Sequence, residues 1–89
     1  MSRTTSWHVE IFLYEDGERT RAEAVLRTSA GTELRHEGIA RRNPEDSEVP
    51  EIGEELAASR ALGGLAHDLF EATLADVEQN VHRPVRLKA

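Results

Sequence analysis

Residues 39–56, Ile-Ala-Arg-Arg-Asn-Pro-Glu-Asp-Ser-Glu-Val-Pro-Glu-Ile-Gly-Glu-Glu-Leu, contain the point where the hydrophobic pattern of the chain changes its period. Before this segment apolar and polar residues alternate, as in a β-strand. After it apolar residues recur every three or four positions, as in an α-helix. Pro44, Pro50 and the residues that precede them cannot form a helix interior or a central strand. We therefore expect a sheet over about residues 6–42, a loop over 43–50 and helices over about 51–82.

The stretch before the loop predicts three strands joined by short turns. Every odd position of residues 7–14 is large and apolar, which places Trp7, Val9, Ile11 and Leu13 on the core face of a first strand. Asp16-Gly17 is a hairpin signal, and residues 29–32 form a second turn between two further alternating segments. Short turns between strands predict an antiparallel meander.

The stretch after the loop predicts two helices. The first begins near residue 51 and ends near residue 72, because Thr73 and Asp76 have the spacing of a cap for a short second helix. Residues 83–89 would form a terminal extension. Gly63-Gly64 lies inside the long helix, where each glycine costs about 1 kcal/mol relative to alanine. We expect the helix to lie close to the sheet there, and a break of the helix at these glycines is the alternative.

Together these elements predict one α+β domain over residues 1–89. Its order is β-β-β-α-α, a three-stranded antiparallel meander with one long and one short C-terminal helix packed on one face. A domain this small has a thin core and often gains stability from a partner.

The net charge of −6 is concentrated in one segment. Residues 45–55 contain six acidic residues and no basic one, whereas the remainder of the chain is neutral. A helix start favours negative charge through its macrodipole, and this explanation is preferred to the alternative of an acidic partner-binding site.

No arrangement of residues in the sequence predicts catalysis. The chain has no cysteine, and its four histidines form no metal-binding or catalytic pattern. We therefore expect no enzyme, no metal, no cofactor and no small-molecule substrate. No apolar run approaches the length of a membrane span, so we expect no membrane association and a cytoplasmic location.

The outward face of the sheet has the composition of an interface. It carries apolar residues among arginines and glutamates, which favours a homodimer that uses Phe12, Tyr14, Val25 and Ile39. An edge strand, either the first or the third, could also be extended by another chain.

Five basic residues are candidates for contacts with RNA phosphates if the C-terminus folds back beside the third strand. They are Arg41, Arg42, Arg83, Arg86 and Lys88.

The chain also resembles a small actinobacterial family of unknown function. The resemblance rests on Trp7-His8-Val9, on Val81-His82-Arg83-Pro84-Val85 and, most specifically, on the segment around the loop. The motif residues of that segment are Asn43, Pro44, Val49, Pro50, Glu51, Ile52, Gly53 and Arg60. The resemblance implies a fold similar to the double-stranded-RNA-binding domain. It also implies a role in hypoxia or dormancy and a likeness to ribosome hibernation factors, which bind the small subunit through basic surfaces.

The motif has a structural explanation as well, because Asn43-Pro44 would end the third strand and Val49-Pro50 would start the helix. The leading hypothesis is a non-enzymatic homodimeric binding module, associated with stress or dormancy, that acts on the ribosome or on structured RNA. The alternative is a protein–protein adaptor that uses the outer sheet face or the acidic segment 45–55 and has no role with nucleic acid.

Overall fold

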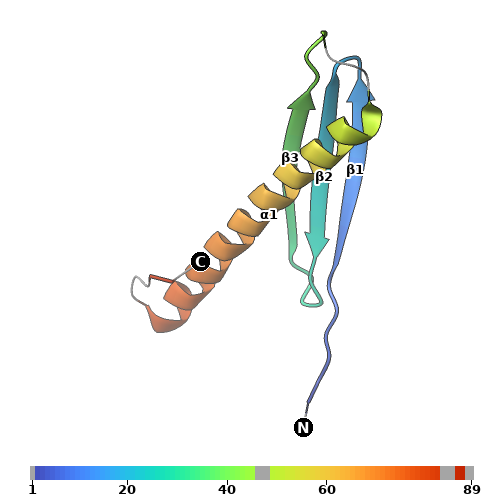
Figure 1. Ribbon diagram of the computed structural model, residues 1–89. Helices are drawn as coiled ribbons and strands as arrows, with labels where there is room; N and C mark the ends of the chain where they lie inside the picture. The colour runs from blue at the N-terminus through green and yellow to red at the C-terminus, as the bar shows by residue number, and fades with distance from the viewer. Residues whose placement is uncertain (1, 46–48, 83–85, 88–89) are drawn as a thin grey trace.

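The computed structural model describes residues 2–45, 49–82 and 86–87, and it consists of a sheet with one helix laid across it (Figure 1). The elements follow the order β1 (His8–Asp16), β2 (Arg19–Arg27), β3 (Glu33–Arg41) and α1 (Pro50–Val81). The three strands form one antiparallel sheet in the order β1-β2-β3. The predicted α+β meander followed by a long helix is confirmed.

Two glycines make the turns between the strands possible. Gly17 has a φ of 63° and Gly31 a φ of 86°, in the left-handed region that favours glycine. The turns hold a continuous register in which Leu13 lies opposite Ala22 and Ala22 lies opposite Gly38. This row of residues lies on the face that α1 covers.

The prediction of two helices was wrong, because α1 is a single helix of 32 residues. Thr73 does not cap a second helix. Its hydroxyl donates to the carbonyl oxygen of Leu69 at 2.9 Å, within the same helix. A threonine inside a helix satisfies its hydroxyl in this way without interrupting the backbone. Val49 is the N-cap, without a side-chain hydrogen bond, and Pro50 occupies the first turn as expected.

The core between α1 and the sheet is built from small residues. Its buried members are Ala22, Ala24, Leu26, Ala40, Ala57, Ala61 and Leu65. Gly38 allows the closest approach, since a Cβ at that position would overlap the Ala57 carbonyl oxygen and the Ala61 nitrogen of the helix backbone. A Cβ at Gly64 would overlap the ring of His36, whereas Gly63 has nothing within 4 Å. The predicted close approach is therefore confirmed at Gly64, and the helix does not break at either glycine.

Because α1 packs on β2 and β3 and hardly touches β1, the predicted burial of the first strand was wrong. Figure 1 shows α1 crossing the sheet obliquely, with its C-terminal half extending beyond the sheet. All nine residues of β1 are exposed. The exposed fractions of Trp7, Val9, Ile11 and Leu13, which alternation places on the core face, lie between 37% and 49%.

The large residues of α1 also lie mainly outside the core. Ile52, Leu56 and Leu62 recur at helical spacing, yet their exposed fractions are 62%, 40% and 41%. The buried residues of α1 that meet the sheet are Ala57, Ala61 and Leu65, so these larger side chains flank the contact. Helical periodicity identified the helix but not the side that is buried.

Candidate functional site

The face of the sheet opposite α1 carries a network of ion pairs across the three strands. Arginines and glutamates share this face, and most of the ion pairs join diagonal neighbours. Arg27 and Glu33 are directly opposite, whereas Glu23 lies opposite Glu37. The paired side chains are Arg21–Glu37 (3.1 Å), Arg27–Glu10 (2.8 Å), Arg27–Glu33 (3.0 Å), Arg35–Glu23 (2.8 Å) and Arg35–Glu33 (3.3 Å). The hydrogen bond from Arg35, with the charges of Arg35 and Arg27, lowers the pKa of Glu33.

This network changes the role of one predicted interface residue. Val25 lies between Glu10 and Arg35 in the register, and its exposed fraction is only 1%. The long side chains around it cover its apolar surface within one chain. Val25 therefore offers almost no surface to a second molecule, while Ile39 is half-buried.

The two aromatic residues predicted on this face remain exposed. Phe12 is 39% exposed and Tyr14 is 46% exposed, and both belong to β1. The guanidinium carbon of Arg21 lies 4.1 Å from the centre of the Tyr14 ring, a cation–π contact. Arg21 thus bridges the aromatic ring and the carboxylate of Glu37.

At the end of the same face two arginines lie beside each other, and Asp16 of β1 lies opposite one of them, Arg19. Arg19 of β2 and Arg41 of β3 are opposite residues in the register, and both are exposed. Within the described part of the chain neither forms a salt bridge. Like charges directly opposite each other destabilise a sheet, and Asp16 offsets the charge of Arg19 only from the other side. Arg41, whose one opposite residue is Arg19, is therefore the more favourable of the two for an anion. Sequence analysis missed Arg19 because the strand register was unknown.

The predicted basic residues that the structure describes, Arg41, Arg42 and Arg86, are not gathered into one patch. Arg42 is half-buried, its backbone nitrogen donates to the Glu18 carbonyl at 2.7 Å, and its side chain donates to the Asn43 carbonyl at 3.5 Å. Arg86 is exposed and follows the C-terminal end of α1, whereas Arg41 and Arg42 lie near its N-terminal end. A helix of 32 residues spans roughly 48 Å, which keeps these residues apart. Arg83 and Lys88 lie outside the described residues.

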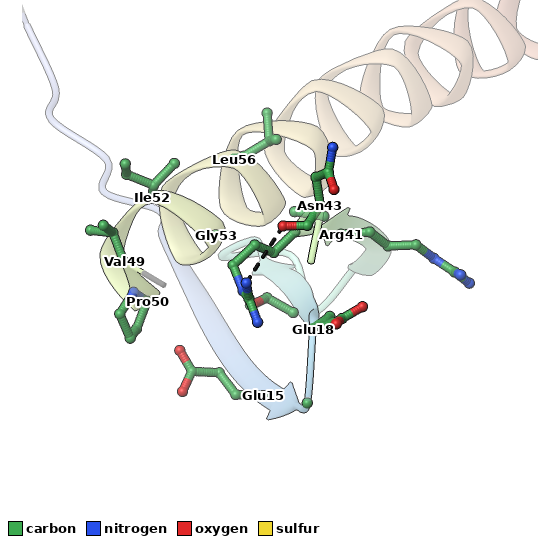
Figure 2. Close-up of a pocket in the computed structure, with 13 residues that line it drawn as sticks. Glu15, Glu18, Arg41, Asn43, Val49, Pro50, Ile52, Gly53 and Leu56 are labelled. Carbon is green, nitrogen blue, oxygen red and sulfur yellow. Dashed lines mark hydrogen bonds between the residues drawn. The ribbon is translucent and has the colours of Figure 1, made fainter. Parts of the chain in front are cut away.

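The family motif does converge, on a pocket of about 390 Å³ beside the start of α1. Figure 2 shows Val49, Pro50, Ile52 and Gly53 at the first turn of the helix, with Asn43 near the end of β3 and Glu15 and Glu18 near the β1–β2 turn. The side chain of Arg41 points away from the pocket in this view. The lining is mixed, with apolar residues of α1 facing two carboxylates and the guanidinium of Arg42.

Several motif residues have clear structural roles. The side-chain oxygen of Asn43 accepts a hydrogen bond from the Glu45 nitrogen at 3.0 Å, which shapes the turn that contains Pro44. Glu51 lies in the first turn of α1, where negative charge is favourable. Asp46 and Glu48 of the acidic segment lie outside the described residues.

Arg60 links α1 to the edge strand β3. Its Nη1 donates to the carbonyl oxygen of Ile39 at 2.6 Å, so the helix satisfies a backbone acceptor of β3. By contrast, α1 makes only slight contact with β1.

The described residues contain no cluster of three or more potential metal ligands. His36 Nδ1 lies 2.8 Å from an Asp68 carboxylate oxygen and packs against Gly64, as expected for a histidine with a packing role. No helix in the described ranges is long and apolar enough to span a membrane.

Comparison with known proteins gives a consistent assignment. A model of the Rv2632c-like family matches residues 5–86. The chain is 44% identical over 77 residues to the uncharacterized protein Rv2632c of Mycobacterium tuberculosis, with 86% of this chain and 82% of the relative covered. It is 43% identical over 81 residues to the uncharacterized protein MT1780 of the same species, with 91% and 85% covered. The crystal structure of Rv2632c matches with a TM-score of 0.82 and 40% identity, over 93% of this chain and 98% of that chain.

Proposed function

The chain belongs to the Rv2632c-like family, and we propose that it works as a non-enzymatic, homodimeric binding module for structured RNA, such as that of a ribosomal subunit. The observation that supports the dimer is that small residues are buried in this chain while large apolar residues are exposed. The core is built mainly from alanines, whereas Trp7, Ile11, Phe12 and Ile52 are all more than one-third exposed. A monomer that buries its small residues and exposes its large ones is completed by a partner.

The support for RNA comes from the end of the outer sheet face. Arg19 and Arg41 lie side by side, with Asp16 opposite Arg19 and no acid opposite Arg41. Arg21 stacks on the exposed ring of Tyr14 two residues further along β2. Phosphate groups would relieve the repulsion between the two arginines, and exposed rings on a sheet are a common platform for bases. Since the chain has a net charge of −6, this binding would be local rather than driven by the whole surface.

The experiment is a charge reversal that separates binding from folding. Arg41→Glu places a carboxylate opposite Arg19, so the fold should be slightly stabilised while phosphate binding is lost. Arg3→Glu makes the same change of charge at an exposed residue before β1 and serves as the matched control. Cosedimentation with ribosomes and retention of a structured RNA on a filter, both at low salt, are the measurements.

The expected result is loss of binding by Arg41→Glu and retention by Arg3→Glu. In the unmodified protein the logarithm of the affinity should fall with the logarithm of salt, by about 0.7–0.9 per phosphate contact. Absence of binding by the unmodified chain even at low salt would exclude the RNA function, because phosphate contacts are strongest there.

The proposed physiological setting is stress or dormancy, with occlusion of translation as the effect. This part of the proposal rests on the resemblance to hibernation factors and not on the geometry. Recovery of the chain with ribosomes from oxygen-starved cells, and not from growing cells, would support it. Recovery from neither would count against it.

A second candidate function, a protein–protein adaptor, is favoured by the motif pocket. Ile52 is 62% exposed at the rim of a 390 Å³ pocket that also contains Glu15 and Glu18. An apolar site beside acidic groups suits a basic-apolar peptide segment of a protein partner. Ile52→Lys should abolish adaptor binding and leave RNA binding unchanged, whereas Arg41→Glu should have the opposite pattern.

A further inference from the structure

We propose that two copies of the chain pair through the free edge of β1 to form one continuous six-stranded antiparallel sheet, with Phe12 of each copy opposite Phe12 of the other. This inference rests on the proposed homodimer and names the surface that makes it. The sequence prediction placed that surface on the outer face, where Val25 is buried, and named an edge strand, the first or the third, as a further possibility.

The two edges of the sheet differ in a way that selects β1. α1 packs against β3 and hardly touches β1, and the Arg60 side chain already occupies the Ile39 carbonyl oxygen of β3. The β1 edge carries nine consecutive residues in unbroken register with β2, without a proline. Natural proteins protect such edges with charge, bulges or a covering element. The acidic residues of β1 are Glu10, Glu15 and Asp16, so the central residues 11–14 carry no charge.

Both faces of β1 would gain from a neighbouring strand. On the side of α1, Val9, Ile11 and Leu13 are 44%, 37% and 41% exposed, and on the opposite side Phe12 is 39% exposed. Pairing adds main-chain hydrogen bonds and brings these side chains against their symmetry mates.

The avoidance of like charges and the length of the paired strand select the register. In a two-fold antiparallel pair, residues that face each other point to the same side, so the axis passes through one residue of β1. An axis at Glu10 places Glu10 against itself, and an axis at Leu13 places Glu10 against Asp16. Both registers oppose like charges.

An axis at Phe12, the middle residue of His8–Asp16, uses the whole strand. It sets Ile11 against Leu13 on the α1 side, Phe12 against Phe12 on the outer side, and His8 against Asp16 at each end. An axis at Ile11 also avoids facing acids, but it leaves Glu15 and Asp16 beyond the paired strand, so that fewer residues of β1 are paired.

The absence of cysteine from the chain permits a direct test by single-cysteine variants under mild oxidation. Opposite residues of an antiparallel pair have Cα atoms about 4.5–5.5 Å apart, within the range that a disulfide spans. Phe12→Cys should therefore convert fully to a cross-linked dimer. Tyr14→Cys should stay uncross-linked, since its two copies would lie four residues apart along the strands, roughly 14 Å. Ile11→Cys tests the neighbouring register, and Glu37→Cys, exposed on β3, tests the other edge.

Each outcome has a definite meaning. Cross-linking by Phe12→Cys alone supports the proposal, whereas cross-linking by Ile11→Cys or Glu37→Cys alone overturns the register or the edge. If the chain has a dimer mass in solution but no variant cross-links, pairing through the β1 edge is rejected and the proposed homodimer stands. A monomer mass rejects both the β1 pairing and the homodimer. Amide hydrogen exchange of the unmodified protein is independent of any variant. β1 amides that gain protection with protein concentration support the pairing, and unchanged β1 amides contradict it.

Discussion

Replacing Gly38 by alanine tests the contact on which the helix–sheet packing depends. The added Cβ would overlap the Ala57 carbonyl oxygen and the Ala61 nitrogen, which are main-chain atoms of two fully buried residues. No side chain can rotate away, so α1 must move off the sheet. Overpacking of this kind costs about 1–3 kcal/mol, and a helix displaced by 0.5–1 Å forfeits a quarter to a half of each dispersion contact it makes.

Two opposing contributions set the expected change in the free energy of unfolding. Alanine in place of glycine would by itself stabilise a strand by about 0.5–1 kcal/mol, which offsets part of an overpacking cost near the upper limit of about 3 kcal/mol. We expect a net loss of about 2 kcal/mol in the free energy of unfolding, a large fraction of the stability of so small a domain. Urea unfolding followed by circular dichroism, at one fixed protein concentration, measures it.

The same substitution at Gly63 is the matched control. Nothing lies within 4 Å of a Cβ at Gly63, and the residue is exposed inside α1. Gly63→Ala should therefore stabilise the protein by about 1 kcal/mol, the difference in helix propensity. If Gly38→Ala proved neutral or stabilising, the close contact between the backbones of α1 and β3 would be refuted.

Three further predictions concern single side chains. Thr73→Ala should stabilise the chain by about 0.5 kcal/mol in urea unfolding, because Thr73 is inside a helix; a loss near 1 kcal/mol would restore the capping interpretation. Arg60→Ala should cost about 1 kcal/mol in the same assay by removing the bond to the Ile39 carbonyl, and no loss would mean that this bond is not maintained in solution. The hydrogen bond from Arg35 lowers the Glu33 pKa below its usual 4.5, so the associated stability is present above pH 4.5 and is lost as pH falls through the lowered value. Glu33→Gln should weaken this acid dependence of the urea midpoint, and an unchanged profile would contradict the assignment.

The order of strands and helix could be predicted because each rests on local signals. Alternation over residues 7–14, the Asp16-Gly17 turn and the proline-bounded loop are short-range features that tertiary packing did not override. The missed continuity of α1 at Thr73 has a local cause too, since a threonine serves equally well as a cap or as an interior residue that bonds back along its helix.

The location of the core could not be predicted from periodicity. Hydrophobic patterns mark faces, but the side that is buried depends on where the helix lies, and here the small residues at Gly38 and Ala57 draw it over β2 and β3. The large residues of β1 satisfy a core pattern and remain exposed. The Arg19–Arg41 pair depends on register, which alternation alone leaves open.

The mass of the unmodified chain in solution tests the central claim most directly. Light scattering coupled to size exclusion should give twice the 9.9 kDa of the chain, a dimer in which a partner covers the exposed residues of β1. A mass of 9.9 kDa that persists to the highest attainable concentration would contradict the account, because Trp7, Ile11 and Phe12 would then face water in the functional state.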